Sequence, residues 1–180
     1  GGRLLRFDKS GLVEYISPKL ADICKEINVS LEKGKRYPDE VIRKICRYMA
    51  EILLEVSGAR PRSRLLELTL SPKSTALRLD YKIDRVSFTG GVADYIYNNQ
   101  AETDLYKFGD IGILLGYEIK AILNDFASKV IMPEETIMAT VVGAGTQTMD
   151  ISGSTISYSQ SATLPLKNIP IIEITEKEER

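Results

Sequence analysis

Hydrophobic and polar positions alternate in two different ways along the chain, and the difference predicts where strands and helices lie. Segments 3–7 and 12–16 are short apolar runs on either side of the turn DKSG, a pattern that indicates a β-hairpin. Ser17 and Pro18 follow, and they mark a helix start because serine caps helices and proline fits their first turn. A short helix is therefore expected directly after the hairpin.

The clearest helix is predicted over residues 38–58, where apolar side chains recur at helical spacing. Its apolar stripe consists of Val41, Ile42, Ile45, Cys46, Met49, Ile52, Leu53 and Val56. The acidic pair Asp39 and Glu40 suits the helix start, and Gly58 is placed to end the helix. Four charged residues fall outside the stripe: Arg43, Lys44, Arg47 and Glu51. These four either face solvent or line part of a ligand cleft.

Shorter apolar runs follow. Residues 65–70 (LLELTL) and 86–88 (VSF) are too short for ordinary helices and are predicted as strands. Residues 110–125 have a helical period despite Gly112 and Gly116. Because glycine in a helix costs about 1 kcal/mol relative to alanine, either another backbone or a ligand comes close there, or the helix is weak. Alternating strands and helices indicate an α/β structure.

Two of the predicted strands end in small residues, and these turns are candidate binding positions. In VSFTGGVADYIY, residues 86–97, a strand meets Gly90 and Gly91 and the chain then restarts as a helix. A glycine pair leaves no Cβ between backbone and ligand, although the same sequence also suits an ordinary strand-to-helix corner. Residues 136–148 repeat this pattern as a β-branched run and a turn. The small residues of the second turn are Gly143, Ala144 and Gly145.

Composition limits the chemistry of the 180-residue chain. The 24 Lys and Arg residues balance 25 Asp and Glu, so no positive field draws the chain to nucleic acid. The absence of histidine excludes an imidazole base and the usual zinc sites. Cys24 and Cys46 fall in predicted helices and are expected to be buried free thiols. Neither a bilayer-spanning run nor a secretory signal is present, so a cytoplasmic protein without membrane partners is expected.

Carboxylates and hydroxyls near the glycine turns are the remaining chemical groups. Asp94, Asp110 and Asp150 either order a metal-bound water or cap helices, and capping is the commoner role. The hydroxyls downstream of the second turn are expected to be structural, and they belong to Ser152, Ser154 and Thr155. The chain contains neither a phosphate loop nor a dinucleotide-binding glycine motif.

Three motifs in order resemble one protein family. VSFTGGVA resembles the adenosine motif of the actin, heat-shock chaperone and sugar kinase superfamily. FTGGVADYIY, FGDIGILLG and ATVVGAGTQTMDISGSTI together resemble the C-terminal half of the ethanolamine ammonia-lyase reactivating factors, the ethanolamine utilization protein A family. GGRLLRFD also resembles that family, and the resemblance extends from Gly1 to about Ser157.

The resemblance implies an α/β fold, the C-terminal lobe of an actin-like (ribonuclease H-like) ATPase, over residues 1–180. In such a lobe helices flank a mixed sheet. A helical subdomain at about 17–62 would close over the nucleotide, and segments 1–16 and 63–180 would form the sheet-containing subdomain.

The resemblance also implies candidate contacts to a nucleotide. The residues expected against adenosine are Gly90, Gly91, Val92 and Ala93, with Gly91 allowing the closest approach. Those expected at the end of a neighbouring strand near the same cleft are Gly143, Ala144 and Gly145. Asp94 and Arg47 are further candidate contacts, and no residue is expected to bind a metal.

The function implied is that of an ATP-dependent reactivating chaperone, which promotes exchange of damaged cobalamin in adenosylcobalamin-dependent ethanolamine ammonia-lyase. ATP with Mg²⁺, ADP and the lyase would be its partners, and a bacterial microcompartment is a candidate location. Both phosphate-binding hairpins of the superfamily are missing here, so this chain is expected to be a piece of a longer protein and not to hydrolyse ATP alone. An actin-like scaffold protein with a nucleotide site is the alternative, and a sugar or acid kinase lobe is a third hypothesis.

Overall fold

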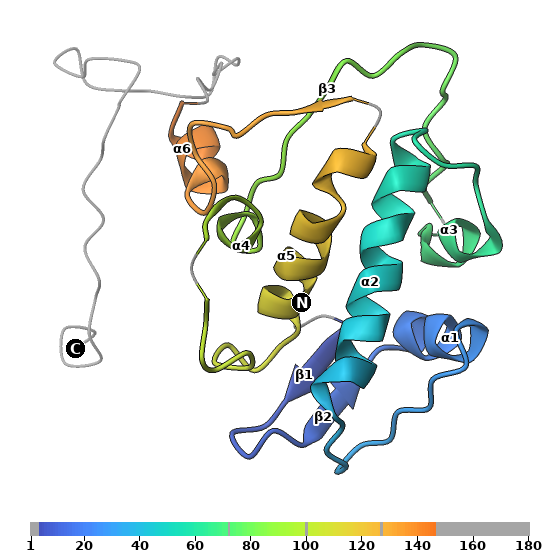
Figure 1. The fold of residues 1–180 in the computed structure, drawn as a ribbon, viewed down its shortest axis with the longest axis vertical. Coiled ribbons are helices and arrows are strands. Elements are labelled where there is room, and N and C mark those ends of the chain that lie inside the picture. Colours follow the sequence, from blue (N-terminus) through green and yellow to red (C-terminus); the bar gives the residue numbers. More distant parts are fainter. Residues whose placement is uncertain (1–3, 72, 100, 127, 147–180) are drawn as a thin grey trace, which may run out of the picture. The chain divides into compact units, whose positions relative to one another are not determined.

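The described part of the chain folds as a mixed α/β structure of helices and two small sheets (Figure 1). The computed structural model describes residues 4–71, 73–99, 101–126 and 128–146. Their elements, in chain order, are β1 (Leu5–Phe7), β2 (Val13–Ile16), α1 (Pro18–Glu26), α2 (Asp39–Val56), α3 (Arg64–Thr69), β3 (Arg85–Val86), α4 (Ala93–Tyr97), α5 (Gly112–Ala121), the 3₁₀ helix η1 (Leu123–Asp125), β4 (Lys129–Val130) and α6 (Ala139–Thr146).

The predicted hairpin and the helix after it are confirmed. β1 and β2 pair antiparallel. Asp8 shapes their turn, because its Oδ1 accepts hydrogen bonds from the N–H groups of Ser10 and Leu12 at 2.8 and 3.0 Å. Ser17 caps α1 by accepting a hydrogen bond from the N–H of Leu20 at 3.2 Å.

The predicted long helix is also confirmed, as α2, which runs alongside α5 (Figure 1). Its buried apolar side chains are Ile42, Ile45, Cys46, Ala50, Ile52 and Leu54. Gly58 follows the helix with a φ of +78°, a conformation that glycine adopts without strain. The amphipathic stripe therefore places α2 at the centre of the packing.

Two apolar clusters form the core, and both include α2 and α5. The first joins the hairpin, α1 and the first halves of α2 and α5, with Leu5, Leu20, Ile45, Ile111 and Leu114 among its buried members. The second joins the last halves of these two helices to β3 and α4, with Leu54, Ile96, Ile119 and Phe126 buried. The predicted period over residues 110–125 is confirmed as α5 and η1.

Cys24 and Cys46 are free and buried, as predicted. Burial raises the pKa of the Cys24 thiol to about 11 and that of Cys46 to about 12. Because the thiolate is the reactive form, we expect both to react slowly with Ellman's reagent in the folded protein and rapidly in urea. The free energy of unfolding should also fall as the pH rises above the ordinary value of 9.0, since only unfolded thiols then release protons. Fast labelling of the folded protein at neutral pH would contradict this packing.

One predicted strand, residues 65–70, is wrong, because α3 occupies this segment. Ser63 caps the helix by accepting a hydrogen bond from the N–H of Leu65 at 3.2 Å. Glu55 of α2 in turn accepts a hydrogen bond from the N–H of Ser63 at 2.8 Å. This tertiary contact fixes a helix start that the alternation of apolar residues does not reveal.

The strands predicted before the two glycine turns have different outcomes. The first, predicted over residues 86–88, is confirmed in part, because β3 covers Arg85–Val86 and pairs in parallel with β4. The second is wrong, because residues 139–146 form α6, in which the N–H of Val142 donates to the carbonyl of Met138 at 2.8 Å. A β-branched run becomes a strand only where a neighbouring strand supplies ladder hydrogen bonds.

Two compact units divide the chain, Gly1–Ile137 and Met138–Arg180. Within the second unit the structure describes residues 138–146. The helical subdomain expected at 17–62 stays a prediction. Of the helices in the described ranges, none combines the length and the apolar character that crossing a bilayer requires.

Candidate functional site

The glycine corner, residues 88–93, connects β3 to α4. Gly90 has a φ of +88°, which residues with side chains rarely adopt. Its N–H donates to the carbonyl of Thr136 at 2.8 Å, and its own carbonyl accepts from the N–H of Ala93 at 3.0 Å. No described atom lies within 4 Å of the place where a Cβ would stand on Gly90 or Gly91. The corner therefore presents bare backbone to open space.

Thr136 holds this corner from two sides. In addition to its bond with Gly90, its Oγ1 donates a hydrogen bond to Oδ1 of Asp94 at 2.6 Å. Asp94 lies in the first turn of α4, so the candidate ligand contact already has a structural partner. Thr136 was missed by sequence reasoning, because no motif links two residues 42 positions apart.

Tyr97 ties the end of β3 to the end of β4. Its hydroxyl accepts a hydrogen bond from the N–H of Phe88 at 2.9 Å and donates one to the carbonyl of Ile131 at 2.8 Å. Both backbone groups lie just beyond the short ladder of the two strands. The Tyr97 side chain therefore links the two strands at the point where the backbone hydrogen bonds between β3 and β4 end.

α4 and α5 approach each other closely at Gly116. A Cβ on Gly116 would lie 2.5 Å from Cβ of Tyr95 and 3.1 Å from the carbonyl oxygen of Val92. Of the two explanations for the glycines in this helix, the approach of another backbone is confirmed at Gly116. Asp110 precedes the same helix, and its Oδ1 accepts a hydrogen bond from the N–H of Gly112 at 2.7 Å.

The four residues expected against adenosine have different surroundings. Val92 is half-buried in the second apolar cluster, and Ala93 is fully buried. Gly91 is exposed and Gly90 is half-buried. Any ligand at this corner would therefore meet the backbone of the two glycines first, and Val92 and Ala93 would support them from beneath.

The other predicted glycine turn is part of a helix. Gly143, Ala144 and Gly145 lie within α6, and not at the end of a strand as predicted. They belong to the unit Met138–Arg180, while the glycine corner belongs to Gly1–Ile137. A shared nucleotide cleft stays a prediction.

The candidate contact Arg47 lies on α2, where its Nε is 3.4 Å from Oε2 of Glu118 in α5. The described part of the chain contains no group of three Asp, Glu or Cys side chains placed to hold a metal ion. We assign no metal-dependent step to the described residues. Asp150, Ser152, Ser154 and Thr155 lie outside the described residues.

Comparison with known proteins gives the family. The model of one family, described as "Ethanolamine utilisation protein EutA", matches residues 1–180. The chain is 34% identical over 173 residues to a Salmonella typhimurium protein named ethanolamine ammonia-lyase reactivase EutA. It is 31% identical over 177 residues to the Escherichia coli protein of the same name.

Each of these alignments covers 95% of the chain and 35% of the relative, so the chain spans about a third of the length of these relatives. No solved structure is significantly similar to the chain. The family match covers the whole sequence and includes the three motifs that suggested the resemblance. The chain belongs to the ethanolamine utilisation protein EutA family.

Proposed function

We propose that this chain is part of an ATP-dependent reactivating chaperone for adenosylcobalamin-dependent ethanolamine ammonia-lyase. The observation that carries the proposal is the similarity, along 95% of the chain, to two curated proteins named ethanolamine ammonia-lyase reactivase. The complete protein would promote exchange of damaged cobalamin in the lyase. It would work in the cytoplasm, with a bacterial microcompartment as a candidate location.

The glycine corner supports a nucleotide-binding role within this function. Gly90 and Gly91 present backbone without side chains, and no described atom fills the space above them. The flat base of a nucleoside could pack there at van der Waals distance from the backbone. A residue with a Cβ would prevent that contact. When bound, ATP would supply the free energy of phosphoryl transfer that opens the lyase.

Parts of the proposed ATPase would come from outside the described residues. Phosphoryl transfer needs positioned cations and metal ligands, and the described residues contain no group of three side chains placed to hold a metal ion. The actin-like lobe is likewise part of the proposal, supported by the mixed α/β structure and by the position of the glycine corner after a strand. We therefore assign this chain nucleoside contact and not catalysis.

A reactivation assay tests the proposal on a protein of the full length of its relatives. Ethanolamine ammonia-lyase that is blocked with cyanocobalamin is incubated with the protein, magnesium-ATP and fresh adenosylcobalamin, and ethanolamine turnover is followed. We expect activity to return with ATP and to stay absent when ATP is omitted. Equal recovery without ATP would overturn the ATP dependence, and no recovery under any condition would overturn the reactivating role.

A further inference from the structure

A concave surface lies away from the glycine corner, between α2, α5 and the segment after α4. It is a cleft of about 410 Å³. Its lining includes Arg43, Asn98, Glu102, Leu105, Tyr117 and Lys120. Asn98 follows the C-terminal end of α4, while the glycine corner precedes its N-terminal end, so the helix separates the two places.

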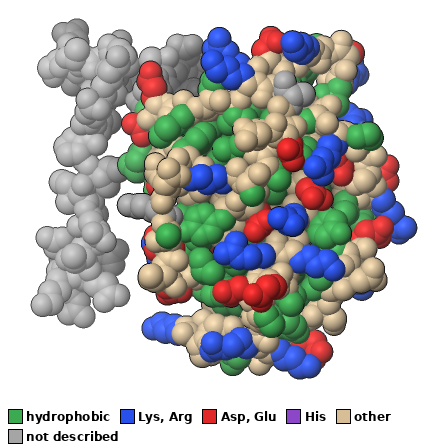
Figure 2. Space-filling model, viewed as in Figure 1, with side chains coloured by type: hydrophobic (Ala, Val, Ile, Leu, Met, Phe, Trp, Pro, Cys, Tyr) green, Lys and Arg blue, Asp and Glu red, His purple; other side chains and the backbone are tan. Residues whose placement is uncertain are grey.

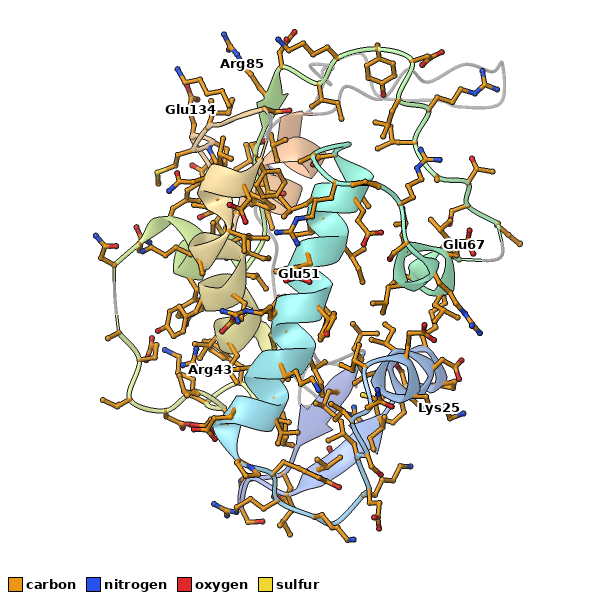
Figure 3. All side chains as sticks on the ribbon, turned by 45° about the vertical axis from the view of Figure 1, so that its right-hand side comes forward. Lys25, Arg43, Glu51, Glu67, Arg85 and Glu134 are labelled. Atoms are coloured by element: carbon orange, nitrogen blue, oxygen red, sulfur yellow. The ribbon has the colours of Figure 1, made fainter. Side chains whose placement is uncertain are left out.

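A buried carboxylate orients cations at this cleft. Glu118 of α5 is buried, and its two oxygens lie 3.3 Å from Nη1 of Arg43 and 3.4 Å from Nε of Arg47. The two guanidinium groups share one negative charge, and the side chains of Arg43 and Arg47 stay 40% and 64% exposed. Figure 3 shows Arg43 extending from α2 into the space beside α5. Their remaining N–H groups are therefore available to another anion.

Lys120 adds a positive charge to the cleft wall, and no carboxylate of the described residues pairs with it. Its Nζ donates to the carbonyl of Asn98 at 2.7 Å and to Oδ1 of Asn99 at 2.5 Å, and both acceptors are neutral. These bonds fix the ammonium group at the cleft wall and leave its third N–H free to donate.

The acidic side chain on the cleft wall is already paired, since Glu102 forms an ion pair with Lys107. The cleft lining thus contains two cations, Arg43 and Lys120, and one carboxylate, which already pairs with Lys107. Figure 2 shows cationic and acidic side chains interspersed on the face where α2 and α5 lie.

We propose that this cleft binds a small anion bearing a phosphate or carboxylate group, at a site separate from the glycine corner. Arg43 and Lys120 donate to the anionic group, and Leu105 and Tyr117 offer an apolar wall to the rest of the ligand. The preorganisation of both cations by neighbouring groups favours binding, because little side-chain freedom is lost when the anion arrives. The proposal does not depend on the proposed nucleotide site.

Calorimetric titration of inorganic pyrophosphate into the full-length protein tests this inference. We expect Lys120→Gln and Arg43→Gln each to raise the dissociation constant about tenfold, the loss expected for one charge-assisted hydrogen bond. Arg6→Gln is the matched control, because it removes an exposed cation of β1 that pairs with Glu14 outside the cleft. Lys120→Gln keeps the test valid if Arg43→Gln disturbs the buried Glu118.

A second comparison separates the two sites. The part of pyrophosphate binding that Lys120→Gln removes should persist in Gly91→Asp, whether or not the protein binds ATP. Absence of binding at millimolar pyrophosphate would overturn the inference, and so would binding that Gly91→Asp removes and Lys120→Gln does not. Binding of a glutamate-rich peptide without pyrophosphate binding would also overturn it, because the cleft would then be a protein-docking surface.

Discussion

Gly91→Asp abolishes measurable binding of magnesium-ATP to the full-length protein, if the glycine corner contacts the nucleoside as proposed. The new side chain would stand in the open space above Gly91, where the adenosine is expected to pack. A carboxylate there would also repel the phosphates. We expect the dissociation constant to rise at least about a hundredfold, equivalent to about 2.8 kcal/mol. Isothermal titration calorimetry measures this directly.

Two comparisons make this result specific. Gly91 lacks the positive φ of Gly90, and no described atom is close to its Cβ position, so the variant should keep its circular dichroism spectrum. Thr89→Asp places the same charge one residue earlier, at an exposed position, and should change affinity only severalfold. Unchanged affinity of Gly91→Asp would remove the corner from the nucleotide site. If the unchanged full-length protein binds no ATP, the scaffold hypothesis gains over the ATPase.

Gly116→Ala is expected to destabilise the fold by about 2 kcal/mol, the cost typical of overpacking in a tight core. The added methyl group would lie 2.5 Å from Cβ of Tyr95 and 3.1 Å from the carbonyl oxygen of Val92, and backbone must move to relieve the contact. Urea denaturation followed by circular dichroism measures the change in the free energy of unfolding.

The sign of this change is informative, because alanine is favoured over glycine in a helix by about 1 kcal/mol. An increase in stability for Gly116→Ala would show that α4 and α5 are not in close contact. Gly91→Ala is the control, since the same methyl group there meets no described atom within 4 Å and should change stability by no more than about 0.5 kcal/mol.

Elements with strong local signals could be predicted from the sequence. The wide stripe of α2 and the Ser17 cap of α1 both depend on residues within a few positions of one another. The same holds for the hairpin turn at Asp8, which bonds to groups two and four residues away. The sequence signal that predicts each of these elements therefore lies within the element itself.

α3 and α6 were predicted incorrectly because their apolar and β-branched residues favour strands when nothing else is known. The start of α3 depends on Glu55, which reaches Ser63 from another helix. α6 takes a β-branched run into helical hydrogen bonding, and the last strand among the described residues is β4. Propensity without a pairing partner does not define a strand.

At the candidate site the sequence located the glycines but not what holds them. The bare backbone at Gly90 and Gly91 follows directly from residue type. Thr136 fixes this backbone and engages Asp94, and it lies more than 40 residues further along the chain than either Gly90 or Asp94. The cleft beside Glu118 was likewise invisible, since α2 and α5 meet only in three dimensions.

The hydrogen bonds of the Tyr97 hydroxyl couple local unfolding of the β3–β4 pair to local unfolding of α4. β3 and β4 pair over only two residues each, and so short a ladder alone would exchange its amide protons through frequent local unfolding. Tyr97 bonds to both strand ends. Separating the strands therefore also breaks the hydrogen bonds that attach Tyr97 of α4 to them. Strand, corner and helix therefore form one cooperative unit, and a ligand that orders the glycines would slow hydrogen exchange throughout that unit.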